Sequence, residues 1–179
     1  MNYSIYAEST PNPGVMKFVS NRMLADKSIE ITKAEQAKDI SVAKALFNFP
    51  FVKSLYISSN FISIAKTDNV EWDMIAMQLR NFITDFLNEE GLKNYTENIT
   101  EEEIIKTEIQ AEKNTEKIEF TDKEKAIIDL LNEYIKPAVE ADGGAITFNS
   151  YVGDVVTVNL KGACSGCPSA TSTLKGGIE

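Results

Sequence analysis

Apolar and polar residues alternate in short runs over the first part of the chain, a pattern that indicates β-strands. Two such runs contain Ile5 and Phe18 and are separated by the turn-forming sequence Thr10-Pro-Asn-Pro-Gly14. Two more runs, residues 51–57 and 61–65, flank a short polar turn and predict a β-hairpin. The first part of the chain is therefore expected to contain a sheet.

Two other stretches repeat their apolar residues every three or four positions, which predicts amphipathic helices. The first covers residues 37–47 and lies just before Pro50. The second is expected to begin at the capping box Asp68-x-x-Glu71 and to end at Gly91. Because a helical apolar stripe usually packs into a core, we expect that role for Trp72, Ile75, Leu79, Phe82, Ile83 and Phe86.

The second part of the chain predicts one helix followed by a β-hairpin. A capping box, Thr121-Asp-Lys-Glu124, begins the helix, Pro137 is expected to disturb its last turn, and Asp142-Gly143-Gly144 ends it. Strands are expected over residues 146–151 and 155–160. The apolar stripe of this helix consists of Ile127, Leu130, Leu131, Tyr134, Ile135, Ala138 and Val139.

An acidic segment separates the two parts. Residues 97–119 are rich in Glu and Lys and contain no Gly, Pro or aromatic residue. We interpret residues 93–119 as a flexible acidic linker, with a docking site for a basic partner as the alternative. The sequence thus predicts the α+β fold class, with one small domain over residues 1–92 and a second over residues 120–179.

Composition narrows the range of partners. The chain has 179 residues, with 27 acidic and 18 basic side chains and a net charge of −9. Since nucleic-acid binding depends on Lys and Arg, we expect no nucleic-acid partner. No apolar stretch is long enough to span a membrane, so no membrane partner is expected. The first residues show neither a secretory signal nor an Arg-rich transit peptide, which predicts a cytoplasmic protein.

The chain has no histidine and only two cysteines, Cys164 and Cys167. This excludes Ser–His and Cys–His catalytic pairs and mixed Cys/His zinc sites. The cysteines lie in the small-residue sequence Gly162-Ala-Cys-Ser-Gly-Cys-Pro168, and Pro168 suits the first position of a helix. We therefore expect Cys167 near a helix N-cap, with both thiols exposed and favoured as thiolates.

Three kinds of chemistry suit an exposed pair of thiolates. A structural zinc ion and an iron–sulfur cluster each require four ligands, so each would need two chains that both contribute Cys164 and Cys167. Thiol–disulfide exchange is the third, although the pair follows a hairpin near the end of the chain rather than a first strand. A protein-interaction module is a more distant alternative, which would leave both thiols inert.

Two groups of residues resemble the NifU-like (Nfu) family of iron–sulfur scaffold proteins. In the second part these are Asp142-Gly-Gly144, Gly162-Ala-Cys-Ser-Gly-Cys-Pro-Ser169 and Thr173-Leu-Lys-Gly-Gly-Ile-Glu179. In the first part, Thr10-Pro-Asn-Pro13 followed by Lys17-Phe18 resembles the Nfu N-terminal domain, as do Leu46, Phe47, Val52, Phe61, Ile62 and Lys66 in that order.

The resemblance implies a cluster carrier with no substrate turnover. Cys164 and Cys167 match the ligand cysteines of the family. Two chains are then expected to hold one [4Fe-4S] cluster, or a [2Fe-2S] cluster, as a homodimer. The implied partners are apo iron–sulfur proteins as recipients and an upstream assembly scaffold as donor, with the N-terminal domain serving recognition or regulation.

The resemblance also implies that the last helix of the family continues beyond the position of Glu179. The C-terminal domain is therefore expected to be truncated, with apolar surface exposed on its first helix.

Overall fold

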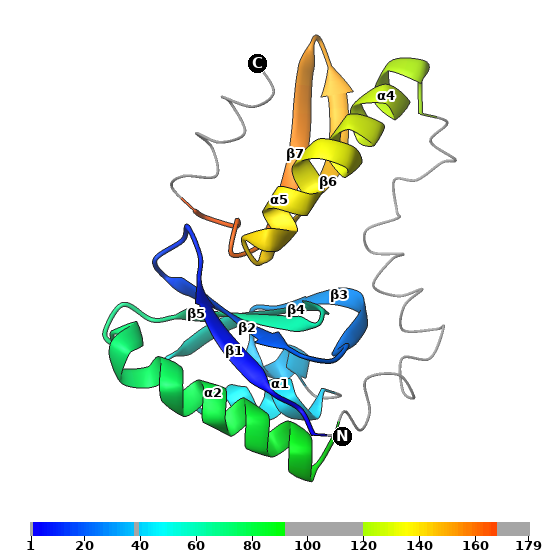
Figure 1. The fold of residues 1–179 in the computed structure, drawn as a ribbon. Helices are drawn as coiled ribbons and strands as arrows, with labels where there is room; N and C mark the ends of the chain where they lie inside the picture. Colours follow the sequence, from blue (N-terminus) through cyan, green and yellow to red (C-terminus); the bar gives the residue numbers. More distant parts are fainter. Residues whose placement is uncertain (1, 38–39, 92–119, 168–179) are drawn as a thin grey trace.

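The structure is a computed structural model that describes residues 2–37, 40–91 and 120–167. The N-terminal half (residues 2–91) combines a sheet with helices, and the C-terminal half (residues 120–167) combines a helical segment with a hairpin (Figure 1). The predicted α+β fold class is confirmed. The predicted linker, residues 93–119, and the last predicted helix, with its expected truncation, lie outside the described residues.

The N-terminal half contains an antiparallel sheet of five strands in the order β1-β2-β5-β4-β3. These strands are β1 (Ile5–Ser9), β2 (Val15–Ser20), β3 (Ala25–Ile31), β4 (Val52–Ser59) and β5 (Phe61–Lys66). The predicted hairpin of β4 and β5 is confirmed. Strand β3 was not predicted, because Asp26, Lys27 and Glu30 leave too few apolar residues for a clear strand pattern.

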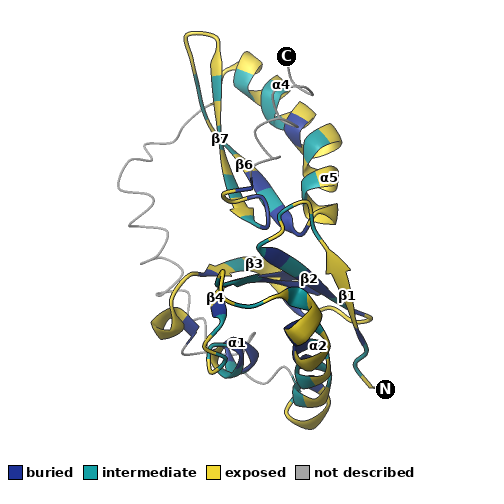
Figure 2. Ribbon diagram, turned by 90° about the vertical axis from the view of Figure 1, so that its left-hand side faces the viewer, coloured by how far each residue is buried: buried dark blue, intermediate teal, exposed yellow. Residues whose placement is uncertain are grey.

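Helices cover one face of this sheet (Figure 1). They are the 3-10 helix η1 (Ala34–Ala37), α1 (Ser41–Leu46) and α2 (Trp72–Glu89). Leu79 and Ile83 of α2 are fully buried against the sheet, together with Phe18 of β2 and Ile64 of β5. Figure 2 shows this buried layer between the helices and the strands. The predicted core stripe of α2 is therefore confirmed.

The start of α2 differs from the prediction. The helix begins at Trp72, with Glu71 as an N-cap that accepts no side-chain hydrogen bond, so the expected capping box at Asp68 does not form. The Trp72 indole instead donates a hydrogen bond of 2.9 Å to the carbonyl of Pro13. This contact ties the start of the helix to the β1–β2 turn. The end agrees with the sequence, since Gly91 has a φ of +66°.

The C-terminal half has a broken helical segment followed by a hairpin. Its elements are α4 (Asp122–Leu130), the π-helical turn η2 (Leu131–Ile135), α5 (Lys136–Ala141), β6 (Gly144–Val152) and β7 (Val155–Gly162). The Thr121–Glu124 capping box is confirmed in full. The disturbance caused by Pro137 falls in the preceding turn, where its missing N–H and its ring prevent regular α-helical hydrogen bonding.

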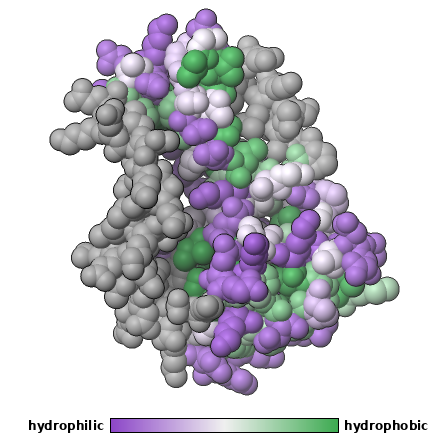
Figure 3. Space-filling view, turned by 180° about the vertical axis from the view of Figure 1, so that it is seen from behind, coloured by the Kyte–Doolittle hydropathy of each residue, from purple (hydrophilic) through white to green (hydrophobic). Residues whose placement is uncertain are grey.

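Much of the apolar stripe in the C-terminal half lies at the surface. Leu131 is buried, but Leu130 is 57% and Tyr134 is 64% exposed. Val152 and Val155, on either side of the turn between β6 and β7, are also exposed. Figure 3 shows apolar side chains at the surface of this end of the molecule. The apolar surface that was expected on this first helix is therefore present, because the hairpin covers only one side of the helical segment.

We expect leucine-to-alanine substitution to lower the free energy of unfolding much more at a buried position of α2 than at an exposed position of α4. Leu79→Ala empties a fully buried position and should lower the free energy of unfolding by about 2–5 kcal/mol. Leu130→Ala, at a position that is 57% exposed, should change it by less than about 0.5 kcal/mol. Urea unfolding followed by circular dichroism measures both, and equal losses would contradict this packing.

Candidate metal centre

Cys164 and Cys167 lie on a compact turn directly after β7. The Ser165 amide donates to the Gly162 carbonyl at 3.1 Å, and the Cys167 amide donates to the Cys164 carbonyl at 3.4 Å. Gly166 has a φ of +73°, a conformation that glycine adopts without strain. These tight turns hold the two cysteines close together on a short loop, which we call the cysteine loop (residues 162–167).

The C-terminal end of α5 and the start of β6 pack around Cys164. Its Sγ atom lies 4.0 Å from the carbonyl oxygen of Val139. A Cβ atom placed on Gly144 would come within 2.7 Å of that sulfur and of the Lys161 carbonyl oxygen. Glycine at position 144 is therefore required for the cysteine loop to pack this closely against the hairpin. The loop is also joined to the helix end, because the Ala163 amide donates to the Gly143 carbonyl at 3.1 Å.

The prediction of exposed thiolates is wrong for this structure. Cys164 is 8% and Cys167 is 7% exposed. Burial raises the pKa of the Cys164 thiol to about 11, with smaller contributions from Asp142 and Cys167. The prediction considered only the small residues around the pair and a helix N-terminus at Pro168, which lies outside the described residues. It did not consider the packing of the loop against α5 and β6.

Four side chains of the N-terminal half form hydrogen bonds around the cysteine loop, and sequence reasoning assigned none of them to the site. They are Asn12, Lys17, Glu30 and Ser63. The sequence contained one signal, a lysine within the otherwise apolar run of β2. The sequence places Asn12 in a predicted turn and in the family resemblance, whereas its bond to Ala163 bridges 151 positions of the sequence. No local pattern predicts such a contact.

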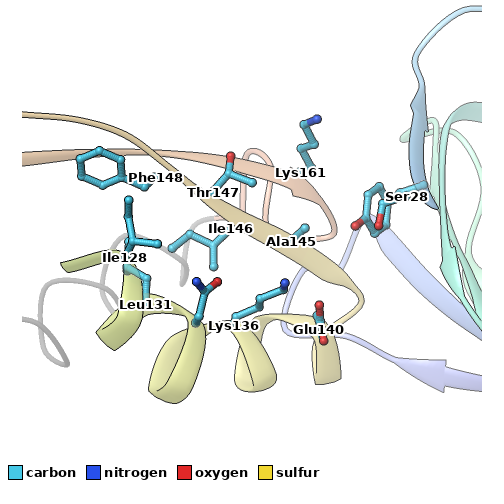
Figure 4. Close-up of a pocket in the computed structure, with 12 residues that line it drawn as sticks. Ser28, Ile128, Leu131, Lys136, Glu140, Ala145, Ile146, Thr147, Phe148 and Lys161 are labelled. Atoms are coloured by element: carbon cyan, nitrogen blue, oxygen red, sulfur yellow. The ribbon is translucent and has the colours of Figure 1, made fainter. Parts of the chain in front are cut away.

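A separate groove of about 280 Å³ lies between the helical segment and β6 (Figure 4). Its apolar floor includes Ile128, Leu131 and Ile146, and Ser28 of the N-terminal half borders one end. Neither cysteine lines this groove. The candidate metal-binding cysteines therefore lie outside this groove.

The described residues around the loop do not complete a metal site within one chain. Within residues 2–37, 40–91 and 120–167, no three Cys, Asp or Glu side chains gather as a metal site would require. The described part of one chain thus offers two soft ligands and no complete metal site.

Within the described residues, no helix combines the length and apolar character needed to cross a membrane.

Comparisons with known proteins follow the division into two halves. Residues 5–90 match the family profile described as "Scaffold protein Nfu/NifU N terminal", and residues 127–179 match the "NifU-like domain". The chain belongs to the Nfu/NifU family. The suspected resemblance is thereby confirmed, and the two matches together span most of the chain.

The curated relatives are similar over nearly the whole of this chain. The protein named "NFU1 iron-sulfur cluster scaffold homolog, mitochondrial" of Drosophila grimshawi is 34% identical over 98% of the chain, and its Drosophila sechellia counterpart is 32% identical over 98%. The chain spans only 56% and 59% of their lengths. The solution NMR structure of a NifU-like protein from Saccharomyces cerevisiae has 28% identity and a TM-score of 0.47, covering 54% of this chain and 87% of that one.

These names contradict the predicted cytoplasmic location. The relatives are described as mitochondrial. The prediction relied on the first residues of the chain, which show no transit peptide. The first residues of the chain therefore do not decide its location.

The raised pKa of Cys164 has a measurable consequence for its reactivity. Only the thiolate reacts with iodoacetamide, so a shift from 9.0 to about 11 should slow alkylation near pH 8 about a hundredfold. The rate should then rise about tenfold per pH unit until the pH reaches the pKa. Mass spectrometry of the Cys164 peptide measures the rate, with the chain unfolded in urea as control. Equal rates in the folded and unfolded chains would contradict the burial described above.

Proposed function

We propose that this protein carries an iron–sulfur cluster as cargo, held through Cys164 and Cys167 of two chains and transferred to apo-proteins. Membership of a family whose N-terminal profile is described as that of a scaffold protein supports this role over catalysis. The curated relatives are named iron–sulfur cluster scaffold homologs. The observation that carries the proposal is the cysteine pair itself, placed on one turn of a chain that has no other cysteine and no histidine.

The number of ligands supports a homodimer. Iron–sulfur clusters are typically held by four thiolates, whereas one chain supplies Cys164 and Cys167 only. Two chains related by a two-fold axis would supply four. We propose a [4Fe-4S] cluster as the cargo, with [2Fe-2S] as the alternative. An upstream assembly scaffold is the proposed donor and apo iron–sulfur proteins are the proposed recipients.

The electrostatics of the cysteine loop favour metal binding over thiol–disulfide exchange. An oxidoreductase usually lowers the pKa of its attacking cysteine, whereas here burial raises the pKa of Cys164 to about 11. Metal ions bind thiolates and displace the proton even from a thiol of ordinary or high pKa. The buried thiol is therefore a poor resting nucleophile but remains a suitable ligand once iron is offered. Insulin reduction in the absence of iron would favour the redox alternative.

Substitution of either cysteine tests the proposal. After anaerobic reconstitution with iron and sulfide, we expect the wild-type chain to elute as a coloured dimer with about four thiolates per cluster. Cys164→Ser and Cys167→Ser should elute as colourless monomers. Size-exclusion chromatography with light scattering and in-line absorbance measures both properties in one run. The matched control is Ser165→Ala, which changes an exposed residue between the two cysteines and should behave as wild type.

The burial of the cysteines requires a second pair of variants. A serine hydroxyl buried in place of a thiol costs stability when it lacks a hydrogen bond, so Cys164→Ala and Cys167→Ala should be made in parallel. Circular dichroism establishes that each variant is folded. A folded variant without Cys164 that retained a full cluster and the dimer would rule out the proposed ligand set.

A further inference from the structure

The N-terminal sheet carries a line of polar residues on the face that its helices leave open. Lys17 of β2 pairs with Ser63 of β5, Ser63 pairs with Tyr56 of β4, and Tyr56 pairs with Glu30 of β3. Because neighbouring residues on a strand point to opposite faces, these four lie on the face opposite the apolar core. We call them the polar row. It crosses four adjacent strands in one line.

Three residues of the polar row form hydrogen bonds with main-chain atoms of the C-terminal half. Lys17 donates to the carbonyls of Ala141 at 2.9 Å and Glu140 at 3.3 Å. Ser63 donates to the Gly143 carbonyl at 2.6 Å. These three carbonyls lie at the C-terminal end of α5, where the helix dipole favours a cation. The polar row therefore adds hydrogen bonds to the carbonyls at the end of α5.

The other contacts are formed with the cysteine loop. The Gly162 amide donates to Glu30 Oε1 at 3.0 Å, and Asn12, on the β1–β2 turn beside the row, donates through Nδ2 to the Ala163 carbonyl at 2.9 Å. Ala163 directly precedes Cys164. The N-terminal half thus holds the backbone of the cysteine loop at its first two residues.

Two glycines allow this close approach. A Cβ atom on Gly143 would lie 2.7 Å from Ser63 Oγ, and one on Gly162 would lie 2.8 Å from Tyr56 Cδ1. Both glycines have positive φ, at +82° and +64°. Any other residue at either position would have to move the sheet and the loop apart. The fit is therefore specific in shape as well as in hydrogen bonding.

The chemistry of the polar row suits a reversible contact. Lys17 and Ser63 are 9% and 2% exposed in the docked structure, and Lys17 also lies 3.8 Å from Glu8 and 4.7 Å from the centre of the Phe61 ring. If the halves separated, water would replace the carbonyls as the partners of these polar groups. Contacts of this polar kind are typical of domain interfaces that open and close.

We infer that the polar row is a docking surface for the cysteine loop of the same chain, and that this docked form is the cluster-free form of the protein. The inference rests on the proposed function, because a cluster shared by two chains requires each loop to face its counterpart. In the docked form the sheet side holds the first two residues of the loop, Gly162 and Ala163, and Ala163 directly precedes Cys164. Docking and cluster sharing therefore compete for the same loop.

Two substitutions remove the contacts without altering the cysteines. Asn12→Asp keeps the side-chain oxygen that accepts from the Gly14 amide in the β1–β2 turn, but it replaces the donor to Ala163 with a charged acceptor. Lys17→Met keeps the apolar stem and removes the ammonium group. The matched control is Lys53→Met, which changes an exposed lysine on β4 of the same sheet.

The first measurement uses the cluster-free chain. Amide ¹⁵N relaxation should give one correlation time for both halves of the wild type and of Lys53→Met. It should give two shorter correlation times for the double variant N12D/K17M, with a changed Gly162 amide shift because its bond to Glu30 is lost. A folded double variant whose halves still tumble together would overturn the docking surface.

The second measurement follows cluster uptake during anaerobic reconstitution. Because the double variant lacks the two charge-assisted hydrogen bonds of Lys17 and the neutral one of Asn12, it should form the coloured dimer faster, on the order of tenfold. Lys53→Met should match the wild type. An undocked double variant with unchanged uptake would overturn the competition between docking and cluster sharing. The two proposals fail separately. A cluster retained by folded Cys164→Ala would contradict the proposed function, whereas the relaxation measurement on the cluster-free chain would still test the docking.

Discussion

The five-stranded sheet of the N-terminal half has two faces of different chemistry, and this difference determines which parts of the chain pack on each face. The apolar face is covered by α1 and α2, with Phe18, Ile64 and Leu79 fully buried. The opposite face carries Lys17 and Ser63, which have the end of α5 as their partner. One sheet thus forms a permanent hydrophobic core on one side and a hydrogen-bonded contact on the other.

The C-terminal half is built with much less apolar burial. Its buried hydrophobic side chains are Leu131, Ile146, Ala163, Cys164 and Cys167. The two cysteines are therefore part of the small core as well as the proposed ligands. Packing within this small core buries the thiols and explains why the pKa of Cys164 is raised rather than lowered.

The sequence predicted the features that depend on local chemistry. The Thr121 capping box, the hairpin of β6 and β7, and the helix end at Gly91 all formed as expected, because each is set by residues within a few positions of one another. The cysteine pair was identified in the same way. The start of α2 was predicted wrongly, because the hydrogen bond from Trp72 to Pro13 spans 59 positions. The burial of the cysteines and the role of Asn12 depend on similarly distant contacts, which no window of sequence contains.

The hydrogen bonds described between the two halves all end on main-chain atoms of the C-terminal half, at Glu140, Ala141, Gly143, Gly162 and Ala163. Main-chain atoms are the same in every amino acid, so side chains on the C-terminal surface can change in evolution without weakening this contact. Paired substitutions between the halves would then leave little co-variation for a contact-prediction method to detect. The evolutionary trace of the interface should appear instead as glycine retained at positions 143 and 162, where a side chain would collide with the sheet.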